Sequence, residues 1–293
     1  MREVAIIGAG ELGGATMHEL ARRNVARSIT LIDEQRSAAV GKALDIAQAA
    51  PVEGFATQLS GGSDVSSASG ADVVVIADRF GGGEWQGEEA LAVLKRVCQM
   101  ASRALIVCAG ATSVTLIDRG VRELKVPRAR LLGSAPEALA SGVRALVALA
   151  IDGTARDVAL TVLGLPPARI VIPWGDATVA GFALTRCLAE PVRRQIDARV
   201  ALLWPPGPLA LSAAASAVVA AIEGRSRRIV SCFVAPDSSV SGRMRRPDTP
   251  ATLAAPARTA AMPVRLGPSG VVETVLPALS VAERVAWENA VSL

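Results

Sequence analysis

Short apolar runs alternate with segments of helical periodicity through the first half of the chain. The runs are typical of strands buried on both faces of a parallel sheet, and they lie at Val4–Ile7, Ile29–Ile32, Val73–Ala77, Leu105–Cys108 and Leu131–Leu132. The segments between them place apolar residues at helical spacing, at Leu12–Arg23, Ala38–Ala49, Glu88–Met100 and Val114–Leu124. This alternation predicts an α/β fold with a doubly wound parallel sheet.

The pattern changes after residue 140, which predicts a second, α+β domain. Helices are expected at Ser141–Ile151, 178–203 and 209–223, and strands at Val158–Leu163, Ile170–Ile172, Val230–Val234, Pro263–Leu266 and Val271–Val275. The Pro-, Arg- and Ala-rich stretch 243–261 has no steady period, so we expect a loop insertion there. Ser280 and Glu283 have capping-box spacing at the start of a last helix. We predict two domains, residues 1–138 and residues 139–293.

Composition narrows the possible function classes. The 293 residues are 51% hydrophobic and 20% charged, which excludes a disordered chain. The net charge is +4, but the basic residues are scattered and aromatic residues make up only 3%, so we expect no nucleic-acid partner. The longest apolar run, near 213–222, is too short to cross a bilayer, and the N-terminus lacks the apolar stretch of a signal peptide. We therefore expect a cytoplasmic protein with no membrane partner.

Metal and disulfide chemistry are not indicated either. The four cysteines form no CxxC pair, and the single histidine, His18, cannot complete a zinc site with them. There is no tyrosine, so a tyrosine proton donor is excluded.

A glycine-rich motif carries the clearest functional signal. Residues Gly8–Gly13 match G-x-G-x-x-G, follow an apolar strand and open a helix, and Asp33 lies twenty residues later. Glycines there permit a tight turn and a close approach of the backbone to a pyrophosphate, which the helix N-terminus attracts. A glycine turn that only packs a strand on a helix is the alternative, but the complete βαβ context favours a Rossmann dinucleotide site.

The same segment indicates which dinucleotide binds. Asp33 is expected to accept hydrogen bonds from the adenosine ribose, and Glu34 beside it would repel a 2′-phosphate, so NAD is preferred over NADP. His18, two turns into the helix, is interpreted as a surface or packing residue. The predicted cofactor-binding residues are Gly8, Gly10, Glu11, Leu12, Gly13, Asp33 and Ala77.

With these motifs, the chain resembles the lactate/malate dehydrogenase family, particularly its lactate-dehydrogenase-like malate dehydrogenases. The resemblance implies a C-terminal domain like the substrate domain of that family, and a homodimer or homotetramer. It rests on the glycine loop, Leu31–Asp33, Gly41–Ile46 with Pro51, Ala71–Ile76, Arg130–Gly133, Val162–Gly164, Thr178–Gly181 and Gly267–Val271.

The polar residues of that family's chemistry are replaced in this chain. The family uses two arginines on a mobile lid, an asparagine, an Asp and an Arg in Leu-Asp-x-x-Arg, and a histidine. In the same order, these positions fall on Gly81 and Gly87, Gly110, Leu139 and Gly142, and Pro166. No histidine follows His18, and no asparagine lies between Asn24 and Asn289. Loss of a positioned proton-transfer group typically costs about 10² to 10⁴ in rate, so 2-hydroxy-acid turnover is not expected.

Two hypotheses follow. We favour a non-catalytic NAD-binding protein that acts as a sensor, scaffold or partner of an active relative. The alternative is an NAD-dependent oxidoreductase that uses a rebuilt site on another alcohol or carbonyl substrate. The residues considered for that site are Asp78, Glu84, Trp85, Glu137, Arg144, Arg169 and Asp176. Among them, Glu84 is expected to be a solvated loop acid, Arg169 to face water, and the Asp78 carboxylate to repel the pyrophosphate. If NAD does not bind, a purely structural role would remain.

Overall fold

The computed structural model describes residues 1–236 and 258–291. Its first half contains a parallel sheet in the order β3-β2-β1-β4-β7-β8. The apolar runs form β1 (Glu3–Ile7), β2 (Ser28–Ile32), β4 (Val73–Ile76), β7 (Leu105–Cys108) and β8 (Leu131–Gly133), which confirms the predicted doubly wound sheet. The edge strand β3 (Gln58–Gly62) was not predicted, because its sequence QLSGG contains one large apolar residue and two glycines.

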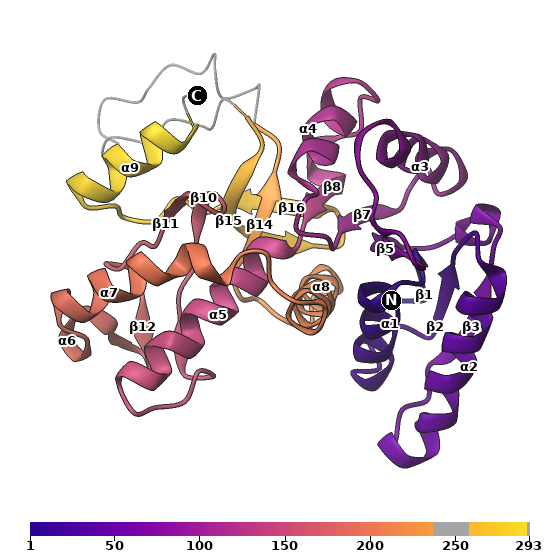
Figure 1. Cartoon of the computed structure of the whole chain (residues 1–293), viewed down its shortest axis with the longest axis horizontal. Coiled ribbons are helices and arrows are strands. Elements are labelled where there is room, and N and C mark those ends of the chain that lie inside the picture. Colours follow the sequence, from indigo (N-terminus) through magenta and orange to yellow (C-terminus); the bar gives the residue numbers. More distant parts are fainter. Residues whose placement is uncertain (237–257, 292–293) are drawn as a thin grey trace.

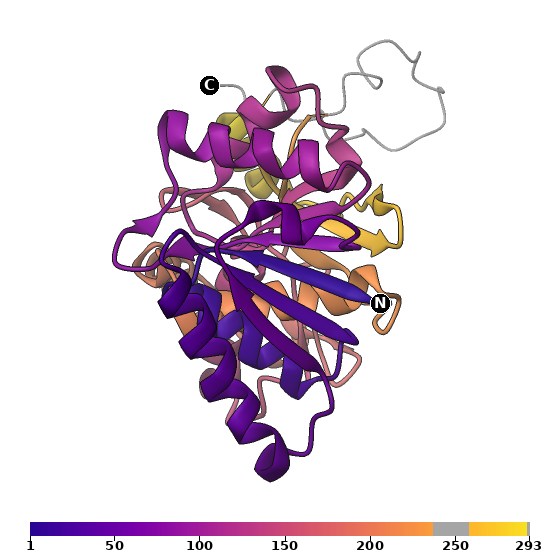
Figure 2. The ribbon, with the colours of Figure 1, turned by 90° about the vertical axis from the view of Figure 1, so that its right-hand side faces the viewer.

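Helices cover both faces of this sheet. Helices α1 and α2 lie on one side, and α3 and α4 lie on the other (Figures 1 and 2). Their bounds agree closely with the predicted segments: α1 (Glu11–Arg22), α2 (Arg36–Glu53), α3 (Gly87–Met100) and α4 (Val114–Arg122). Short 3₁₀ turns lie at η1 (Val65–Ala68) and η2 (Arg128–Arg130). Because the strands are parallel, their carboxyl ends meet at one edge of the sheet, where the glycine loop lies.

The second half of the chain continues the same sheet with antiparallel strands. Strand β14 (Val230–Val234) pairs with β8, β15 (Ala260–Gly267) pairs with β14 and β16 (Gly270–Thr274), and β10 (Leu163–Leu165) and β11 (Arg169–Val171) complete the edge. A smaller sheet joins β9 (Val158–Ala159), β12 (Thr178–Val179) and β13 (Phe182–Ala183). The helices are α5 (Ala135–Ala150), α6 (Leu184–Cys187), α7 (Glu190–Val200), α8 (Pro208–Ile222) and α9 (Val281–Val291), with a 3₁₀ turn η3 (Ala201–Leu203).

Several predicted elements of this half are corrected. The helix expected to start at 178 is instead the β12–β13 hairpin, whose turn holds Ala180 at φ 50° and Gly181 at φ 86°. The single strand expected at Val158–Leu163 is divided between β9 and β10, which belong to different sheets. Helix α5 starts six residues earlier than predicted. The proposed insertion 243–261 lies mostly outside the described residues, and β15 already begins at Ala260.

Two hydrophobic cores support this architecture. The larger one includes the parallel sheet, its helices, α8 and strands β14 and β15, and therefore contains residues from both halves of the chain. A second one lies between α5, α7 and the small sheet. The predicted boundary between residues 138 and 139 stays a prediction.

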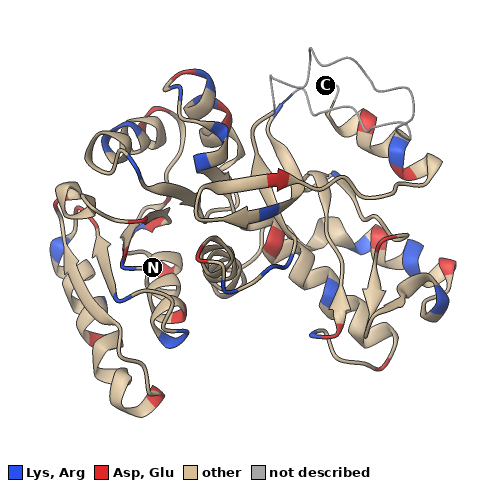
Figure 3. Cartoon of the chain, turned by 180° about the vertical axis from the view of Figure 1, so that it is seen from behind, with Lys and Arg blue, Asp and Glu red and all other residues tan. Residues whose placement is uncertain are grey.

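The capping box and the charge pattern are also visible. The Ser280 NH donates to the Glu283 carboxylate at 2.7 Å, and the Glu283 NH donates to Ser280 Oγ at 3.3 Å, as predicted. Acidic and basic residues are interspersed along the described helices (Figure 3). In the part of the chain that the structure describes, no single helix is long and apolar enough to cross a membrane. The pair Glu190–Leu203 and Pro208–Ile222 meets the criterion only when taken together, across a bend of 101°.

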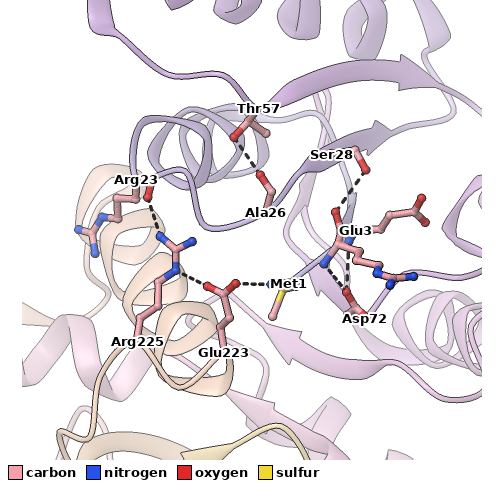
Figure 4. A network of polar contacts seen from close by, with 10 residues as sticks. Met1, Glu3, Arg23, Ala26, Ser28, Thr57, Asp72, Glu223 and Arg225 are labelled. Carbon is pink, nitrogen blue, oxygen red and sulfur yellow. Dashed lines mark hydrogen bonds and ion pairs between the residues drawn. The ribbon is translucent and has the colours of Figure 1, made fainter.

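A polar network lies at the amino end of β1, opposite the glycine loop (Figure 4). The Asp72 carboxylate accepts hydrogen bonds from the backbone NH groups of Arg2 at 2.7 Å and Glu3 at 3.2 Å. Glu223, next to the end of α8, pairs with the amino group of Met1. This network holds the first strand against α8 and is separated from the candidate site by the length of β1.

Candidate functional site

The glycine loop joins β1 to α1 with a geometry that requires glycine. Gly8 has φ +105°, a conformation that L side chains rarely adopt. A Cβ atom on Gly13 would lie 1.9 Å from the carbonyl oxygen of Gly8, so α1 can approach the strand only with glycine there. The buried Ala77, at the end of β4, lies against this contact, with its Cβ 3.6 Å from the same position. The loop therefore has the compact form of a dinucleotide-binding turn.

The backbone NH groups of this loop hold the side chain of Asp78. Leu12 and Gly13 donate to its carboxylate at 3.2 Å and 2.9 Å, and Gly10 donates to its backbone carbonyl at 2.9 Å. A Cβ atom on Gly10 would lie 2.2 Å from Asp78 Oδ2. The N-terminus of α1 attracts an anion, and here the anion belongs to the chain itself. The repulsion of a pyrophosphate by Asp78 stays a prediction; in the structure the carboxylate itself accepts hydrogen bonds from the loop.

Asp33 follows β2 and is buried, with 4% of its surface exposed. Its Oδ2 accepts from the backbone NH of Ala9 at 2.7 Å and of Phe80 at 2.9 Å, and its Oδ1 accepts from Gln35 at 2.9 Å. A carboxylate offers about four acceptor positions, so three of them are used by the protein. Binding of a ribose by Asp33 stays a prediction, and most of the hydrogen-bonding capacity of its carboxylate is engaged by the protein.

Residues 78–84 form a small antiparallel hairpin of β5 (Asp78–Arg79) and β6 (Gly83–Glu84), which we call the acidic hairpin. Its far end is fixed by Glu84, whose carboxylate accepts from the NH groups of Ala111 and Thr112, each at 2.8 Å, and from Thr112 Oγ1 at 2.6 Å. The expectation of a solvated Glu84 was wrong, because this loop after β7 offers unpaired NH groups. The acidic hairpin thus joins the glycine loop to the end of β7.

One cation of the site, Lys42, had no predicted role. Its Nζ donates to the carbonyl oxygen of Gly10 at 2.6 Å and lies 5.8 Å from the ring centroid of Phe80. Lys42 is a residue of α2, so it links that helix to both the glycine loop and the acidic hairpin. Its spacing on α2 gave no signal of this contact. Glu11, in contrast, is exposed at the first position of α1, while Leu12 is buried.

The environment of Cys108, near the site, raises the pKa of its thiol. Cys108 is the last residue of β7 and is buried. Burial, and secondarily the negative charges of Glu84 and Cys98, raise the pKa of the Cys108 thiol to about 12. This thiol is therefore protonated and unreactive under ordinary conditions. In the described ranges, no group of three or more His, Cys, Asp or Glu side chains is arranged to hold a metal ion.

The residues predicted to align with the family's polar groups are glycines, Leu139 and Pro166. Gly81 and Gly87 adopt positive φ of 70° and 57°, Gly110 faces the Glu84 carboxylate, and Leu139 is 1% exposed. Gly142 lies against Leu203, and Pro166 precedes a cis bond to Pro167. His18, on α1, pairs with Glu53 at 2.9 Å.

Most residues considered for a rebuilt site make other contacts in the structure. Glu137 and Arg144 form a buried ion pair with an N–O distance of 2.5 Å. Arg169 is exposed, as expected, and the Asp176 carboxylate accepts from the NH of Ala278 at 3.0 Å. Trp85 is partly buried, with the guanidinium of Arg79 5.2 Å from its ring centroid. Of this group, Asp78 and Glu84 contact the loops at the carboxyl edge of the parallel sheet, and Trp85 directly follows Glu84.

Comparison with known proteins identifies the family of the chain. Residues 2–103 match the lactate/malate dehydrogenase NAD binding domain. A malate dehydrogenase of Thioalkalivibrio sulfidiphilus is 31% identical over 208 residues, which is 68% of each chain. A malate dehydrogenase of Flavobacterium frigidimaris is 30% identical over 207 residues, 67% of each chain.

Solved structures show the same fold over nearly the whole chain. The malate dehydrogenase of Salinibacter ruber superposes with a TM-score of 0.83 at 22% identity, covering 99% of this chain and 94% of that one. A lactate dehydrogenase of Cryptosporidium parvum, complexed with lactic acid and NAD, superposes with a TM-score of 0.82 at 20% identity, covering 99% and 95%. The chain belongs to the lactate/malate dehydrogenase family and carries the NAD-binding domain of that family.

Proposed function

We propose that this chain is an NAD-binding family member that does not oxidise 2-hydroxy acids, and that it acts as a sensor, scaffold or partner of an active relative. The observation that carries the proposal is that no histidine follows His18 and no asparagine lies between Asn24 and Asn289. The alignment expected from the sequence places Gly, Leu and Pro where the family has its arginines, asparagine, aspartate and histidine. Oxidation of a hydroxy acid needs a base for the hydroxyl proton and a cation for the carboxylate. Neither is supplied at these positions.

The carboxylates near the glycine loop do not substitute for the missing base. Asp78 and Glu84 both accept hydrogen bonds from backbone NH groups, and Glu84 accepts a third from Thr112 Oγ1. A general base needs a lone pair directed at the substrate proton. Because these carboxylates face backbone donors, we propose that they serve structure rather than proton transfer.

For the cofactor, we propose that the loop residues and the ends of β2 and β4 hold NAD. The set is Gly8, Gly10, Glu11, Leu12, Gly13, Asp33 and Ala77. Support comes from the tight glycine geometry and from the family's NAD-binding domain. When bound, NAD would supply a hydride acceptor; the chain's own residues would contribute backbone NH donors and the Asp33 carboxylate.

We also propose a homodimer or homotetramer. Large apolar side chains are exposed on α2 and α8: Leu44 at 58%, Val52 at 90% and Leu209 at 78%. Both helices pack against α1. A set of exposed apolar side chains on neighbouring helices is typical of an association surface. Sedimentation velocity would show a dimer or larger species, and a monomer at all concentrations would contradict this proposal.

The test of the function combines binding and turnover. Calorimetric titration with NAD is paired with a screen for NADH formation across malate, lactate, other hydroxy acids and simple alcohols. We expect binding without turnover. NADH formation from malate or lactate would contradict the proposal, and NADH formation only from another alcohol would favour a rebuilt oxidoreductase site.

A further inference from the structure

We propose that the acidic hairpin is an internal competitor of NAD, in which Asp78 holds the backbone NH groups that a cofactor pyrophosphate needs, so that NAD binds only after Asp78 leaves. The contacts that carry this inference are those of Leu12 and Gly13 with the Asp78 carboxylate, at 3.2 Å and 2.9 Å. These NH groups open α1, where dinucleotide-binding loops of this type bind phosphate oxygens.

The two anions cannot share this position. The Asp78 oxygens lie within 2.5 Å of the point where a Cβ atom of Gly10 would be, which is the space that a glycine at this position leaves for a ligand. A second negative charge a few ångströms away would also be repelled, strongly so where water is partly excluded. Binding of a pyrophosphate therefore requires the Asp78 side chain to move away from the loop.

Contacts of the acidic hairpin with the rest of the protein hold Asp78 at the glycine loop. The NH of Phe80, in the same hairpin, donates to Asp33 at 2.9 Å, and Glu84 accepts from Ala111 and Thr112 at 2.8 Å. Three carboxylates, Asp33, Asp78 and Glu84, thus pair with backbone NH groups at the carboxyl ends of the parallel strands. The hairpin thus engages the NH groups of Leu12 and Gly13 and contributes one of the three hydrogen bonds to Asp33.

Little apolar burial opposes movement of the same segment, and the contacts that its release breaks are mainly hydrogen bonds. Its turn contains three consecutive glycines, Gly81 to Gly83, all of them exposed. The side chain of Phe80 is 50% exposed, and Arg79 pairs with Glu89 at the surface. Little apolar surface is therefore lost when the hairpin leaves. The protein therefore has a blocked state, with Asp78 on the loop, and a competent state, with the hairpin released. The apparent affinity for NAD is the affinity of the competent state multiplied by the fraction of molecules in that state.

The direct test is a calorimetric NAD titration of the wild type and of Asp78→Ala. The alanine variant keeps the backbone carbonyl that accepts from Gly10 and removes only the competing carboxylate. If the blocked state holds 90% or more of the molecules, a figure we take as an order of magnitude, the variant binds NAD at least about tenfold more tightly. Asp78→Asn, which removes the charge and keeps the shape, is expected to lie between the two.

Asp72→Ala is the matched control. Asp72 also accepts from two backbone NH groups, at 2.7 Å and 3.2 Å, but lies at the opposite end of β1 (Figure 4). We expect its affinity for NAD to equal that of the wild type. An Asp78→Ala protein that binds NAD no more tightly than the wild type would overturn the inference. This readout is independent of turnover, so it is separate from the test of the proposed function.

A second measurement tests the contact without any cofactor. Gly10 has φ −69°, which alanine also adopts, so Gly10→Ala is opposed mainly by Asp78 and by the weaker capping preference of alanine. The capping effect is the same with and without Asp78. In a double-mutant cycle followed by urea unfolding, Gly10→Ala should lower the midpoint in the wild type at least about twice as much as in Asp78→Ala. Equal losses in both backgrounds would show that Asp78 does not lie in the loop.

Discussion

The Glu84 carboxylate binds Thr112 twice, accepting from its backbone NH at 2.8 Å and from its hydroxyl at 2.6 Å. This pair fixes the acidic hairpin to the loop after β7, which contains Gly110. Together with the hydrogen bonds from the glycine loop to Asp78, it makes the hairpin a bridge between the glycine loop and the loop after β7.

Removal of the Thr112 hydroxyl should loosen that bridge. For Thr112→Val we expect a loss of about 1 kcal/mol in the free energy of unfolding, because one hydrogen bond to a charged acceptor is lost at a partly exposed site. Amide exchange of residues 78–84 should become faster. Thr115→Val, on the exposed face at the start of α4, is the control and should change neither quantity. Unchanged exchange in Thr112→Val would contradict the anchoring role.

Asp33 should matter for folding as much as for cofactor binding. Asp33→Ala leaves the NH groups of Ala9, Gln35 and Phe80 without their acceptor, and we expect a loss of at least about 2 kcal/mol in the free energy of unfolding. The adjacent Glu34 is exposed, so Glu34→Ala should change stability by less than about 0.5 kcal/mol. Urea unfolding of both variants provides the comparison. Equal stabilities would mean that these hydrogen bonds contribute little.

The ion pair of Glu137 and Arg144 is buried, with side-chain exposures of 8% and 10%. Arg144→Met leaves the Glu137 charge buried and should cost about 3–5 kcal/mol. Glu137 also accepts from the NH of Ser231 at 2.9 Å, a contact that glutamine can keep. The double variant Glu137→Gln, Arg144→Met should therefore be more stable than Arg144→Met alone. Thermal or urea unfolding decides this, and the reverse order would exclude an uncompensated charge as the cause.

The four cysteines should differ strongly in reactivity. Burial, and secondarily the charge of Glu137, raises the pKa of the Cys232 thiol. Burial, and secondarily Glu84 and Cys98, raises the pKa of the Cys108 thiol to about 12. Their thiolates are therefore scarce in the native protein. Cys187 is exposed and should be alkylated by iodoacetamide first, followed by the half-buried Cys98. Mass spectrometry of the native protein that shows Cys108 modified as fast as Cys187 would contradict the described environment; in denaturant all four should react.

Much of the fold could be predicted because it depends on local patterns. Runs such as Val73–Ile76 are buried on both faces, and the first thirteen residues combine a strand, the loop Gly8–Gly13 and the start of a helix. The prediction was wrong where the pattern was weak. Strand β3 has few apolar residues, and the β12–β13 hairpin depends on a turn at Ala180 and Gly181 that helical spacing alone does not reveal.

The candidate site was less predictable, because its contacts join residues far apart in the sequence. The position of Asp78 after β4 suggested proximity to the glycine loop, but hydrogen bonds from Leu12 and Gly13 span more than sixty residues. Glu84 and Thr112 are 28 residues apart, and Lys42 and Gly10 are 32 residues apart. Such pairs depend on how strand ends meet at one sheet edge, which apolar periodicity does not encode.

The central claim is that this chain keeps the cofactor fold of its family without the chemistry for 2-hydroxy acids. The most direct measurement is NADH formation from malate and from lactate, by the wild type and by Asp78→Ala, at NAD concentrations that calorimetry shows to be saturating. We predict no formation above a blank without substrate for either protein. Formation of NADH that increases with protein concentration and saturates with malate or lactate would contradict the claim.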